Sequence, residues 1–216
     1  FESLLNEVLK LKLEKEIIII DDCSNDGTYE RVEELVSLNE GIKLYRHQRN
    51  MGKGACVRDG FKHASGDIAI IQDADLEYDP REIPAVIAPI ADGYADVVYG
   101  SRFAGHPRRA LYFWHSLGNK FLTMLSNICT NLNLTDMETC YKAFRKLTYK
   151  NLRLTSNGFD IEPEITAKVA RMHQRVYEVP ISYKGRSYHE GKKINWKDGF
   201  KAILAIFKHS FFSTIS

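Results

Sequence analysis

The sequence predicts a single α/β domain in which a mostly parallel central sheet is flanked by helices. Helical and strand patterns alternate along the first half of the chain, a rhythm that places helices on both faces of a parallel sheet. Ile17–Ile20 is an unbroken β-branched run, as found in strands buried on both faces. The 216 residues are enough for one core, and no linker or internal repeat indicates a second domain.

The elements of the first half follow from apolar spacing and turn residues. Leucine and valine recur at helical intervals over residues 1–10, and Ile17–Ile20 forms the first strand. Ser24–Thr28 supplies turn and cap residues for a helix over about 28–38. After it we expect a strand over 42–45, a helix over 53–64, a strand over 68–72, a helix over 81–90 and a strand over 96–99.

The second half is less regular. We expect helices over 112–130 and 161–173, and extended segments over 139–145 and 175–183, with Pro180 near a sheet edge. The last segment is an amphipathic helix too short and too rich in lysine to span a bilayer, so we expect it to lie on a membrane surface. Its apolar face carries Trp196, Phe200, Ile203, Leu204 and Phe207.

Charge is distributed unevenly along the chain. Residues 1–100 hold 11 Lys/Arg and 20 Asp/Glu, whereas residues 101–216 hold 19 and 8. The acidic half suits a divalent cation and the basic half suits phosphate groups, with no nucleic acid expected. The four cysteines form no C-x-x-C pair, and the sequence starts without a signal-peptide pattern. We therefore expect reduced thiols and a cytoplasmic location at the inner face of a membrane.

Ionic residues follow three predicted strands, at the end where ligands bind in open α/β sheets. They are Asp21 and Asp22, Asp73 and Asp75, and Arg102. In an extended backbone the side chains of Asp73 and Asp75 point the same way, which suits Mg²⁺ or Mn²⁺ shared with a diphosphate. The competing interpretation is a solvated acidic turn. A calcium loop is excluded, because Tyr78 and Pro84 occupy the positions of its glycine and closing glutamate.

Two other features allow different interpretations. A pair such as Asp21–Asp22 also follows a buried strand in phosphoacceptor receiver domains, which are signalling modules, but that class does not explain the two aspartates after the strand 68–72. Gly52–Gly54 lacks the spacing of a phosphate-binding loop. It fits the flexible entry to a helix at least as well as a direct phosphate contact.

Four motifs in order, Ile17–Thr28, Asn50–Ala55, Gln72–Pro80 and Gly100–Phe103, give the chain a resemblance to glycosyltransferase family 2. Within that family it resembles the dolichyl- or polyprenyl-phosphate mannosyl- and glucosyltransferase branch, whose pattern Thr135–Lys142 and Gly185–Lys193 also fit. The resemblance covers nearly the whole chain. It implies a single GT-A domain with inverting chemistry, in which residues 1–100 form the nucleotide-sugar and metal half and residues 101–216 the acceptor half.

The resemblance also implies roles for individual residues. Asp21, Asp22 and Lys53 would bind the nucleotide, and Asp73, Asp75 and Glu77 the metal and diphosphate. The catalytic group would comprise Asp75, Arg102 and Asp136, with Arg102 gripping the acceptor phosphate. A segment that closes over the phosphates would contribute Arg186, Lys192 and Lys193.

The expected reaction moves a hexose from UDP- or GDP-hexose to a polyprenyl or dolichyl phosphate, with Mg²⁺ or Mn²⁺, at a membrane surface or beside a membrane-embedded partner. A phosphate monoester carries about −1.5 to −2 charge at pH 7 and needs no strong base. The alternatives are transfer to a sugar hydroxyl with Asp136 as base, and a nucleotide-binding or receiver-like module without activity. Family members begin with a strand ending in a Pro-x-Tyr-Asn-Glu-like motif. This sequence starts in the helix after it, so either the sequence is truncated or donor binding is impaired; we favour truncation because every later motif is intact.

Overall fold

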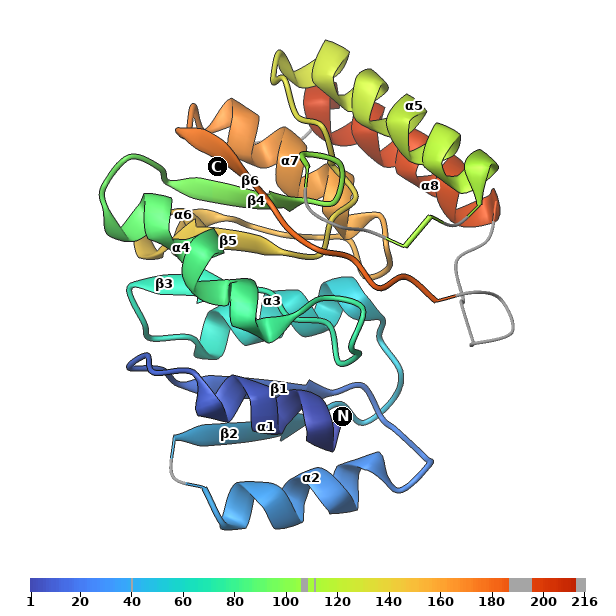
Figure 1. Ribbon diagram of the computed structural model, residues 1–216. Coiled ribbons are helices and arrows are strands. Elements are labelled where there is room, and N and C mark those ends of the chain that lie inside the picture. The colour runs from blue at the N-terminus through green and yellow to red at the C-terminus, as the bar shows by residue number, and fades with distance from the viewer. Residues whose placement is uncertain (40, 106–108, 111, 187–195, 213–216) are drawn as a thin grey trace.

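The computed structural model describes residues 1–39, 41–105, 109–110, 112–186 and 196–212 (Figure 1). Helices and strands alternate through the first half, as predicted. The elements are α1 Glu2–Lys10, β1 Ile17–Asp21, α2 Thr28–Ser37, β2 Ile42–Arg46, α3 Lys53–His63, β3 Ile68–Ile70, the short η1 Pro80–Glu82, α4 Ile83–Ala91, β4 Val97–Ser101, α5 Phe113–Thr130, β5 Lys142–Arg145, α6 Lys146–Asn151, α7 Ile161–Arg171, β6 Val176–Pro180, α8 Trp196–Phe207 and the π-helical η3 Lys208–Phe212.

The strands form two sheets. β1 and β2 pair in parallel, and the larger sheet has the order β3-β5-β4-β6. In the larger sheet β4 and β6 are parallel, whereas β5 runs antiparallel to both β3 and β4. Three of its four strands therefore share one direction, so the expectation of a mostly parallel sheet holds with β5 as the exception. Pro180 ends the edge strand β6, as expected, where its missing N–H costs no ladder bond.

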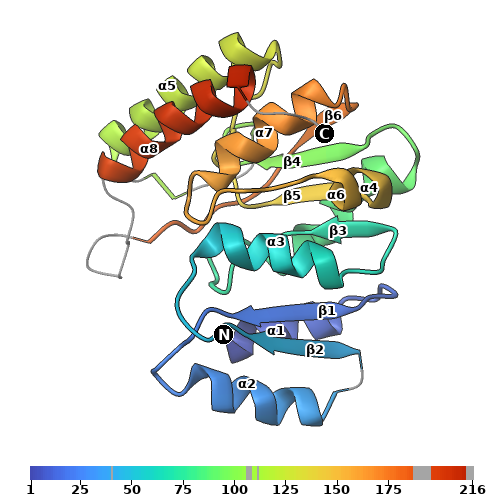
Figure 2. The ribbon, with the colours of Figure 1, turned by 180° about the vertical axis from the view of Figure 1, so that it is seen from behind.

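Helices cover both faces of the sheets, and a separate core lies on each side of β4 (Figures 1 and 2). One core joins Val97 and Tyr99 of β4 to residues from α3, α6 and α7, including Phe61, Tyr149 and Ile165. The other core joins Val98 to α4 through Val86 and Ile90. This alternation along β4 is the period-2 pattern of a strand that is buried on both faces.

Three sequence expectations differ from the structure. β3 ends at Ile70 rather than at Gln72, although the amide of Ile71 still donates to the carbonyl of Lys142 in register with β5. α6 was not predicted, since six residues rich in polar side chains carry little periodicity. β1 is partly exposed along Ile17–Ile20 rather than buried on both faces. Among the described residues, no ladder joins β1 to β3, and the expectation of a preceding family strand stays a prediction.

Candidate active site

The end of β1 organises the turn before α3. Asp22 accepts hydrogen bonds from the backbone amides of Met51 (2.8 Å) and Gly52 (2.7 Å). Asp21 accepts from the amide of Ser24 at 3.1 Å, and its carboxylate lies 3.3 Å from the guanidinium of Arg46. Asp21 therefore holds the turn that follows β1, and Asp22 holds the turn that precedes α3. The Asp22 carboxylate is occupied by backbone amides.

The glycines of this turn have a packing role. Gly52 has a φ of +91°, and a Cβ there would lie 2.4 Å from the carbonyl oxygen of Asn157. A Cβ on Gly54 would lie 2.3 Å from the carbonyl oxygen of Ser156. The amide of Gly54 donates to Asn157 at 2.7 Å. The Gly52–Gly54 motif thus lets the start of α3 approach another backbone segment, which favours the helix-entry interpretation over a phosphate loop.

His47, which the sequence analysis did not select, lies between two carboxylates. Its Nδ1 is 2.7 Å from Asp22 and its Nε2 is 3.0 Å from Asp59. The hydrogen bond to Asp22 raises the pKa of His47, burial lowers it, and the bond to Asp59 raises it further, with a net increase. An imidazolium can donate from both nitrogens, so this geometry suits a protonated His47 that joins Asp22 and Asp59 beside the turn before α3.

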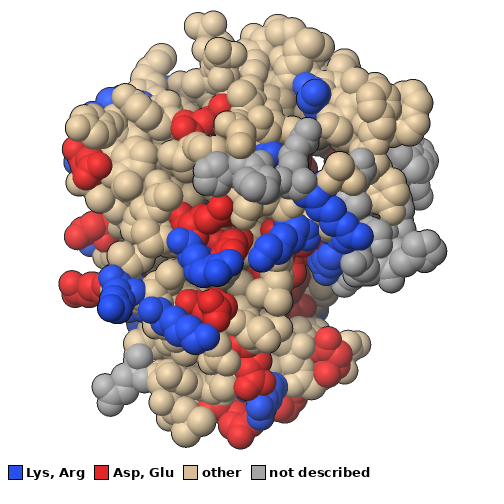
Figure 3. Space-filling model, viewed as in Figure 1, with Lys and Arg blue, Asp and Glu red and all other residues tan. Residues whose placement is uncertain are grey.

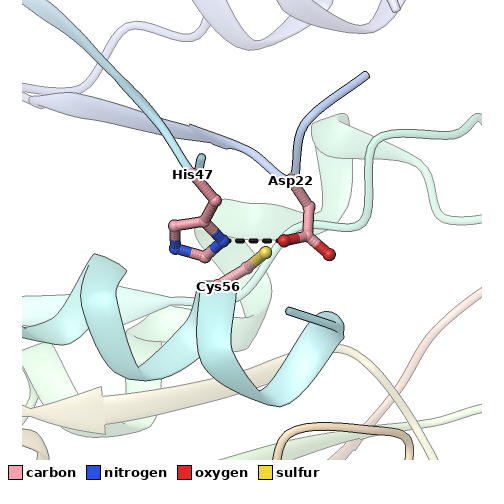
Figure 4. A group of neighbouring side chains, drawn as sticks. All are labelled: Asp22, His47 and Cys56. Atoms are coloured by element: carbon pink, nitrogen blue, oxygen red, sulfur yellow. Dashed lines mark hydrogen bonds and ion pairs between the residues drawn. The ribbon is translucent and has the colours of Figure 1, made fainter. Parts of the chain in front are cut away.

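Cys56 completes a group with Asp22 and His47 whose ligand atoms all lie within 4.8 Å of one another (Figure 4). Both histidine nitrogens already face carboxylates. Burial, followed by Asp22 and Asp59, raises the pKa of the Cys56 thiol to about 11. A protonated thiol beside an imidazolium is a poor metal site, since metal ligands must be deprotonated. All four cysteines are free thiols, as expected.

Asp73 and Asp75 follow β3, and each forms an ion pair with a different basic side chain. Asp73 lies 3.0 Å from Lys53, which also lies 3.0 Å from Glu162 of α7. Asp75 is 2.6 Å from Nη2 of Arg186. Burial raises the pKa of Asp75, and the charges of Glu77 and Asp73 raise it too, against the Glu77 amide and Arg186, which lower it. Among the described residues, the group of at least three candidate ligand atoms that lie within 4.8 Å of one another is Asp22, His47 and Cys56, so the metal role of Asp73 and Asp75 stays a prediction.

Glu77 is tied to the segment after β6. One carboxylate oxygen accepts from the amide and Nε of Arg186 at 2.9 and 2.8 Å, and the other accepts from the hydroxyl of Tyr183 at 2.9 Å. Its carbonyl also accepts from the amide of Lys184 at 2.9 Å. The metal role predicted for Glu77 would require one of these contacts to open, and it stays a prediction.

Arg102 and Asp136, which were selected separately, form one ion pair. Nε and Nη2 of Arg102 donate to the two oxygens of Asp136 at 2.6 and 2.8 Å, and the Arg102 amide donates at 3.1 Å. Asn119 of α5 donates to the same carboxylate at 3.2 Å. The guanidinium lies 5.0 Å from the ring centre of Tyr183. Asp136 therefore orients Arg102. Because both of its oxygens accept hydrogen bonds from Arg102, Asp136 is poorly placed to act as a general base.

A buried charge network escaped the sequence analysis. Lys142 of β5 is fully buried and donates to Glu162 and to the carbonyls of Met137 and Thr139. Because Glu162 also contacts Lys53, the network runs from Lys142 through Glu162 and Lys53 to Asp73. In the sequence, Lys142 is a lysine within a predicted extended segment and Glu162 is a glutamate at a predicted helix start. Neither pattern indicates which residue the side chain contacts.

The predicted charge halves meet at this site. Arg186 of the basic half contacts Asp75 and Glu77 of the acidic half. Figure 3 accordingly shows blue and red side chains interleaved across the middle of one face. Lys192 and Lys193 lie outside the described residues.

A family model described as "Glycosyl transferase family 2" matches residues 1–153. A dolichol-phosphate mannosyltransferase from Pyrococcus furiosus is 33% identical over 189 residues, covering 84% of this chain and 53% of that protein. An undecaprenyl-phosphate mannosyltransferase from Micrococcus luteus is 26% identical, covering 83% of this chain and 76% of that protein. The chain thus spans about half the length of the first of these relatives.

Solved structures show the same fold. Glucosyl-3-phosphoglycerate synthase from Mycobacterium tuberculosis, solved with Mn²⁺, UDP and phosphoglyceric acid, superposes with a TM-score of 0.75 over 99% of this chain and 74% of that one. The sequences are 15% identical. The expected GT-A class of fold is confirmed, and the chain belongs to glycosyl transferase family 2.

Proposed function

We propose that this chain transfers a hexose, with inversion, from a nucleotide-sugar to a polyprenyl phosphate at a membrane surface. The observation that carries the proposal is the position of Tyr183 between two charged clusters. Its hydroxyl bonds Glu77 on the predicted metal and diphosphate side, and its ring faces Arg102 on the predicted acceptor side. One charged cluster therefore contacts the hydroxyl of Tyr183 and the other contacts its ring, an arrangement that suits transfer between a diphosphate and a phosphate. The two mannosyltransferase relatives support this substrate class.

The donor side of the proposal rests on the first half of the chain. Asp21 would contact the nucleotide of a UDP- or GDP-hexose, while Asp22 and His47 hold the turn that shapes its site. Lys53 would face the diphosphate beside Asp73. Glu162 and Arg186 reach this side from the second half, so the proposed division at residue 100 is crossed by side chains.

Asp73 and Asp75 would hold Mg²⁺ or Mn²⁺, in keeping with the Mn²⁺ and UDP of the structural relative. When bound, the ion would neutralise the leaving diphosphate. Arg186 already lies against Asp75 and Glu77, so it is placed to move onto donor phosphates once a stronger cation occupies the carboxylates. Arg102, oriented by Asp136, would position the attacking phosphate opposite the leaving group, which inverts the anomeric centre.

The membrane surface would be formed by α5 and α8, which pack against each other (Figures 1 and 2). α8 buries Ala202, Ala205 and Ile206 and leaves Phe200, Leu204 and Phe207 exposed. α5 exposes a further apolar set, namely Phe113, Trp114, Leu117, Phe121, Met124 and Ile128. The upper part of Figure 3, around α5, carries few charged side chains. Within the described residues, no helix has the length and hydropathy to cross a bilayer, so the proposed contact is lateral.

Vesicle flotation tests this surface. Serine at Phe200 and Leu204 should weaken binding to anionic vesicles while leaving the buried side of α8 intact. Leu38→Ser is the matched control, because Leu38 is exposed at the end of α2. Figure 1 shows α2 at the opposite end of the molecule from α5 and α8. Flotation that survives the double substitution would remove these helices from the membrane surface.

Transfer assays test the reaction. The chain, with Mn²⁺ or Mg²⁺, is given UDP-glucose or GDP-mannose and either farnesyl phosphate or an alkyl glucoside as acceptor. We expect a product from the phosphate and none from the glucoside, and calorimetry should show metal-dependent binding of UDP or GDP. Product from the glucoside alone would favour a hydroxyl acceptor with Asp136 as base. Nucleotide binding without transfer to any acceptor would favour a binding-only role.

A further inference from the structure

The edge strand β6 carries a glutamate, Glu178, whose carboxylate contacts the loop between α5 and β5. The amide of Thr135 donates to both of its oxygens, at 2.9 Å each, and the amide of Asp136 donates to Oε1 at 3.2 Å. A hydrogen bond to an ionised carboxylate is stronger than one between neutral groups. Glu178 therefore holds the loop backbone at Asp136, from a strand that lies 42 positions further along the chain.

A second set of hydrogen bonds connects the same carboxylate to the residues on either side of Arg102. The hydroxyl of Thr135 donates to Oε1 of Glu178 at 3.2 Å, so its oxygen is left to accept from the hydroxyl of Ser101 at 2.6 Å. The oxygen of Ser101 in turn accepts from the amide of Phe103 at 3.1 Å. Every donor in this chain points toward Glu178, and the members of such a chain strengthen one another by polarisation.

The two sets of hydrogen bonds meet at the Arg102–Asp136 pair. One set fixes the backbone that carries Asp136, and the other fixes the backbone immediately before and after Arg102. The amide, Nε and Nη2 of Arg102 then donate to Asp136 at 3.1, 2.6 and 2.8 Å. A single carboxylate, that of Glu178, thus holds the backbone of both members of the pair.

The contacts of Glu178 require a carboxylate rather than an amide. An ionised carboxylate only accepts hydrogen bonds, and the groups that reach it from the loop are two amide N–H groups and one hydroxyl. A glutamine side chain has one accepting oxygen, and its NH₂ group would face one of these donors. Glu178→Gln should therefore release part of the loop and let the Arg102–Asp136 pair shift, with almost no change in side-chain size.

We propose that Glu178 is a positioning residue of the acceptor site, which fixes the place at which the Arg102–Asp136 pair presents its guanidinium to the acceptor phosphate. The inference rests on the proposed function, in which Arg102 holds the attacking phosphate. Glu178 itself contacts no reacting atom and acts through Arg102. Because a displacement of about 1 Å at a reacting group can cost roughly 100-fold in rate, the residue that fixes this pair also controls the rate of transfer.

The first test compares two glutamates that make the same kind of contact. Glu16, just before β1, accepts from the amide and hydroxyl of Ser65 at 2.5 and 2.8 Å and from the amide of Gly66 at 2.8 Å. It is the matched control, because it also joins two successive amides and a hydroxyl, at the end of β1 that lies away from the candidate site.

Both glutamine variants should unfold at a lower urea concentration than the wild type, because each loses hydrogen bonds to a charged group. With saturating nucleotide-sugar and metal, Glu178→Gln should lower kcat/KM for farnesyl phosphate by about 10- to 100-fold. Glu16→Gln should leave this kcat/KM unchanged. Equal losses in the two variants, or no loss in Glu178→Gln, overturn the proposal.

Two further variants separate positioning from general support of the fold. In an Arg102→Lys background the two-pronged contact with Asp136 is already lost, so adding Glu178→Gln should cost far less than it costs alone. Losses that simply multiply overturn the proposal. Thr135→Val removes only the hydroxyl branch and should lower kcat/KM by roughly 3- to 10-fold, which keeps a test available if Glu178→Gln does not fold. An unchanged kcat/KM in Thr135→Val overturns the link to Arg102.

Calorimetry with farnesyl phosphate gives a readout without turnover. Glu178→Gln should weaken binding of farnesyl phosphate and leave the metal-dependent binding of UDP or GDP unchanged. If it does so but the wild type transfers no sugar, the proposed transferase function is overturned and the Glu178 assignment stands. Transfer by the wild type, with equal farnesyl phosphate binding in both proteins, overturns the Glu178 assignment alone. No binding of farnesyl phosphate by the wild type overturns both.

Discussion

Two arginine–carboxylate clusters contact Tyr183, one at its hydroxyl and one at its ring, and they differ in burial. In the acceptor-side pair, the Arg102 side chain is 15% exposed and that of Asp136 is 0% exposed. In the donor-side cluster, the exposed fractions are 43% for Arg186, 24% for Asp75 and 15% for Glu77. An exposed pair is worth little, whereas breaking a buried pair leaves an uncompensated charge. Under the proposed function, the acceptor side would therefore be formed before substrate binds, and the donor side would exchange Arg186 for a metal ion.

Asp75 and Glu77, the two carboxylates of the proposed donor-side cluster, have pKa values that are shifted in opposite directions. Burial raises the pKa of Asp75, and the adjacent charges of Glu77 and Asp73 add to that effect. Burial also acts to raise the pKa of Glu77, but its bonds to Arg186 and Tyr183 outweigh burial and lower it. Glu77 is thus satisfied as an anion and anchors the segment after β6, whereas Asp75 would gain more than Glu77 from the proposed metal.

Among substitutions that test the difference between the two clusters, we expect the largest loss of transfer activity at Asp75. Asp75→Asn removes an anionic metal ligand and should reduce transfer by about 10³-fold or more, with far-UV circular dichroism unchanged. Asp67→Asn is the control, because the Asp67 side chain is 96% exposed. Full activity in excess EDTA, or undiminished turnover by the variant, would contradict the metal assignment and with it the idea of an exchangeable donor side.

Arg102→Lys tests the preformed acceptor side. Lysine keeps the charge but cannot bond both oxygens of Asp136 as Arg102 does. Loss of one charge-assisted hydrogen bond should cost about 1.5–3 kcal/mol, or roughly 10- to 150-fold in acceptor-dependent turnover. Binding of UDP or GDP with metal, measured by calorimetry, should stay the same. If nucleotide binding weakens and acceptor dependence is spared, Arg102 serves the donor and the two sides must be exchanged.

Arg186→Lys is the matched substitution on the donor side, and a smaller effect is expected. Because the Arg186 cluster is partly exposed, replacing its planar contact should lower transfer by less than about tenfold, with a loss that shrinks as salt rises. Rates for both lysine variants measured at low and high salt make the comparison direct. A loss at Arg186 equal to that at Arg102 would show that burial does not separate the two clusters.

Apart from α6, the sequence was sufficient for the order of the main helices and strands and for the end of the sheet that carries the candidate site. Apolar periodicity reports which residues are buried, and α/β geometry places the residues after each strand on one rim, so Asp75 and Arg102 could be selected. Periodicity does not report pairing across the chain. The contact between Lys53 and Glu162, and the insertion of β5 between β3 and β4, join distant segments and became visible only in the structure.

The same limit explains the missed side chains. His47 follows a strand as Asp22 does, but its importance comes from holding Asp22 and Asp59 together, a geometry that spacing does not encode. Glu178 lies within a predicted extended segment, and only the structure shows that its carboxylate holds the loop that carries Asp136. The roles of Lys192 and Lys193 stay predictions, because those residues lie outside the part of the chain that the structure describes.

The smallest effect of a substitution is expected at His47. This histidine lies between Asp22 and Asp59, and its charge depends on pH. The bond to Asp22 raises the pKa of His47 above its ordinary value of about 6.5, against burial, and the bond to Asp59 adds to the rise. The folded protein therefore holds this proton more tightly than the unfolded chain, so the stabilisation is complete below about pH 6.5 and is lost as pH rises through the folded pKa.

His47→Gln should consequently cost on the order of 1 kcal/mol of unfolding free energy at pH 6, and the gap to the wild type should narrow at higher pH. Urea denaturation across that range measures the gap, with His63→Gln as the control for loss of an imidazole that is exposed and stacks on Tyr45 at 3.7 Å. Nucleotide binding should weaken over the same pH range, because Asp22 loses the cation that helps to hold it beside the Met51 and Gly52 amides. A gap that is constant with pH would mean that His47 contributes as a neutral imidazole and that its proton does not hold the turn.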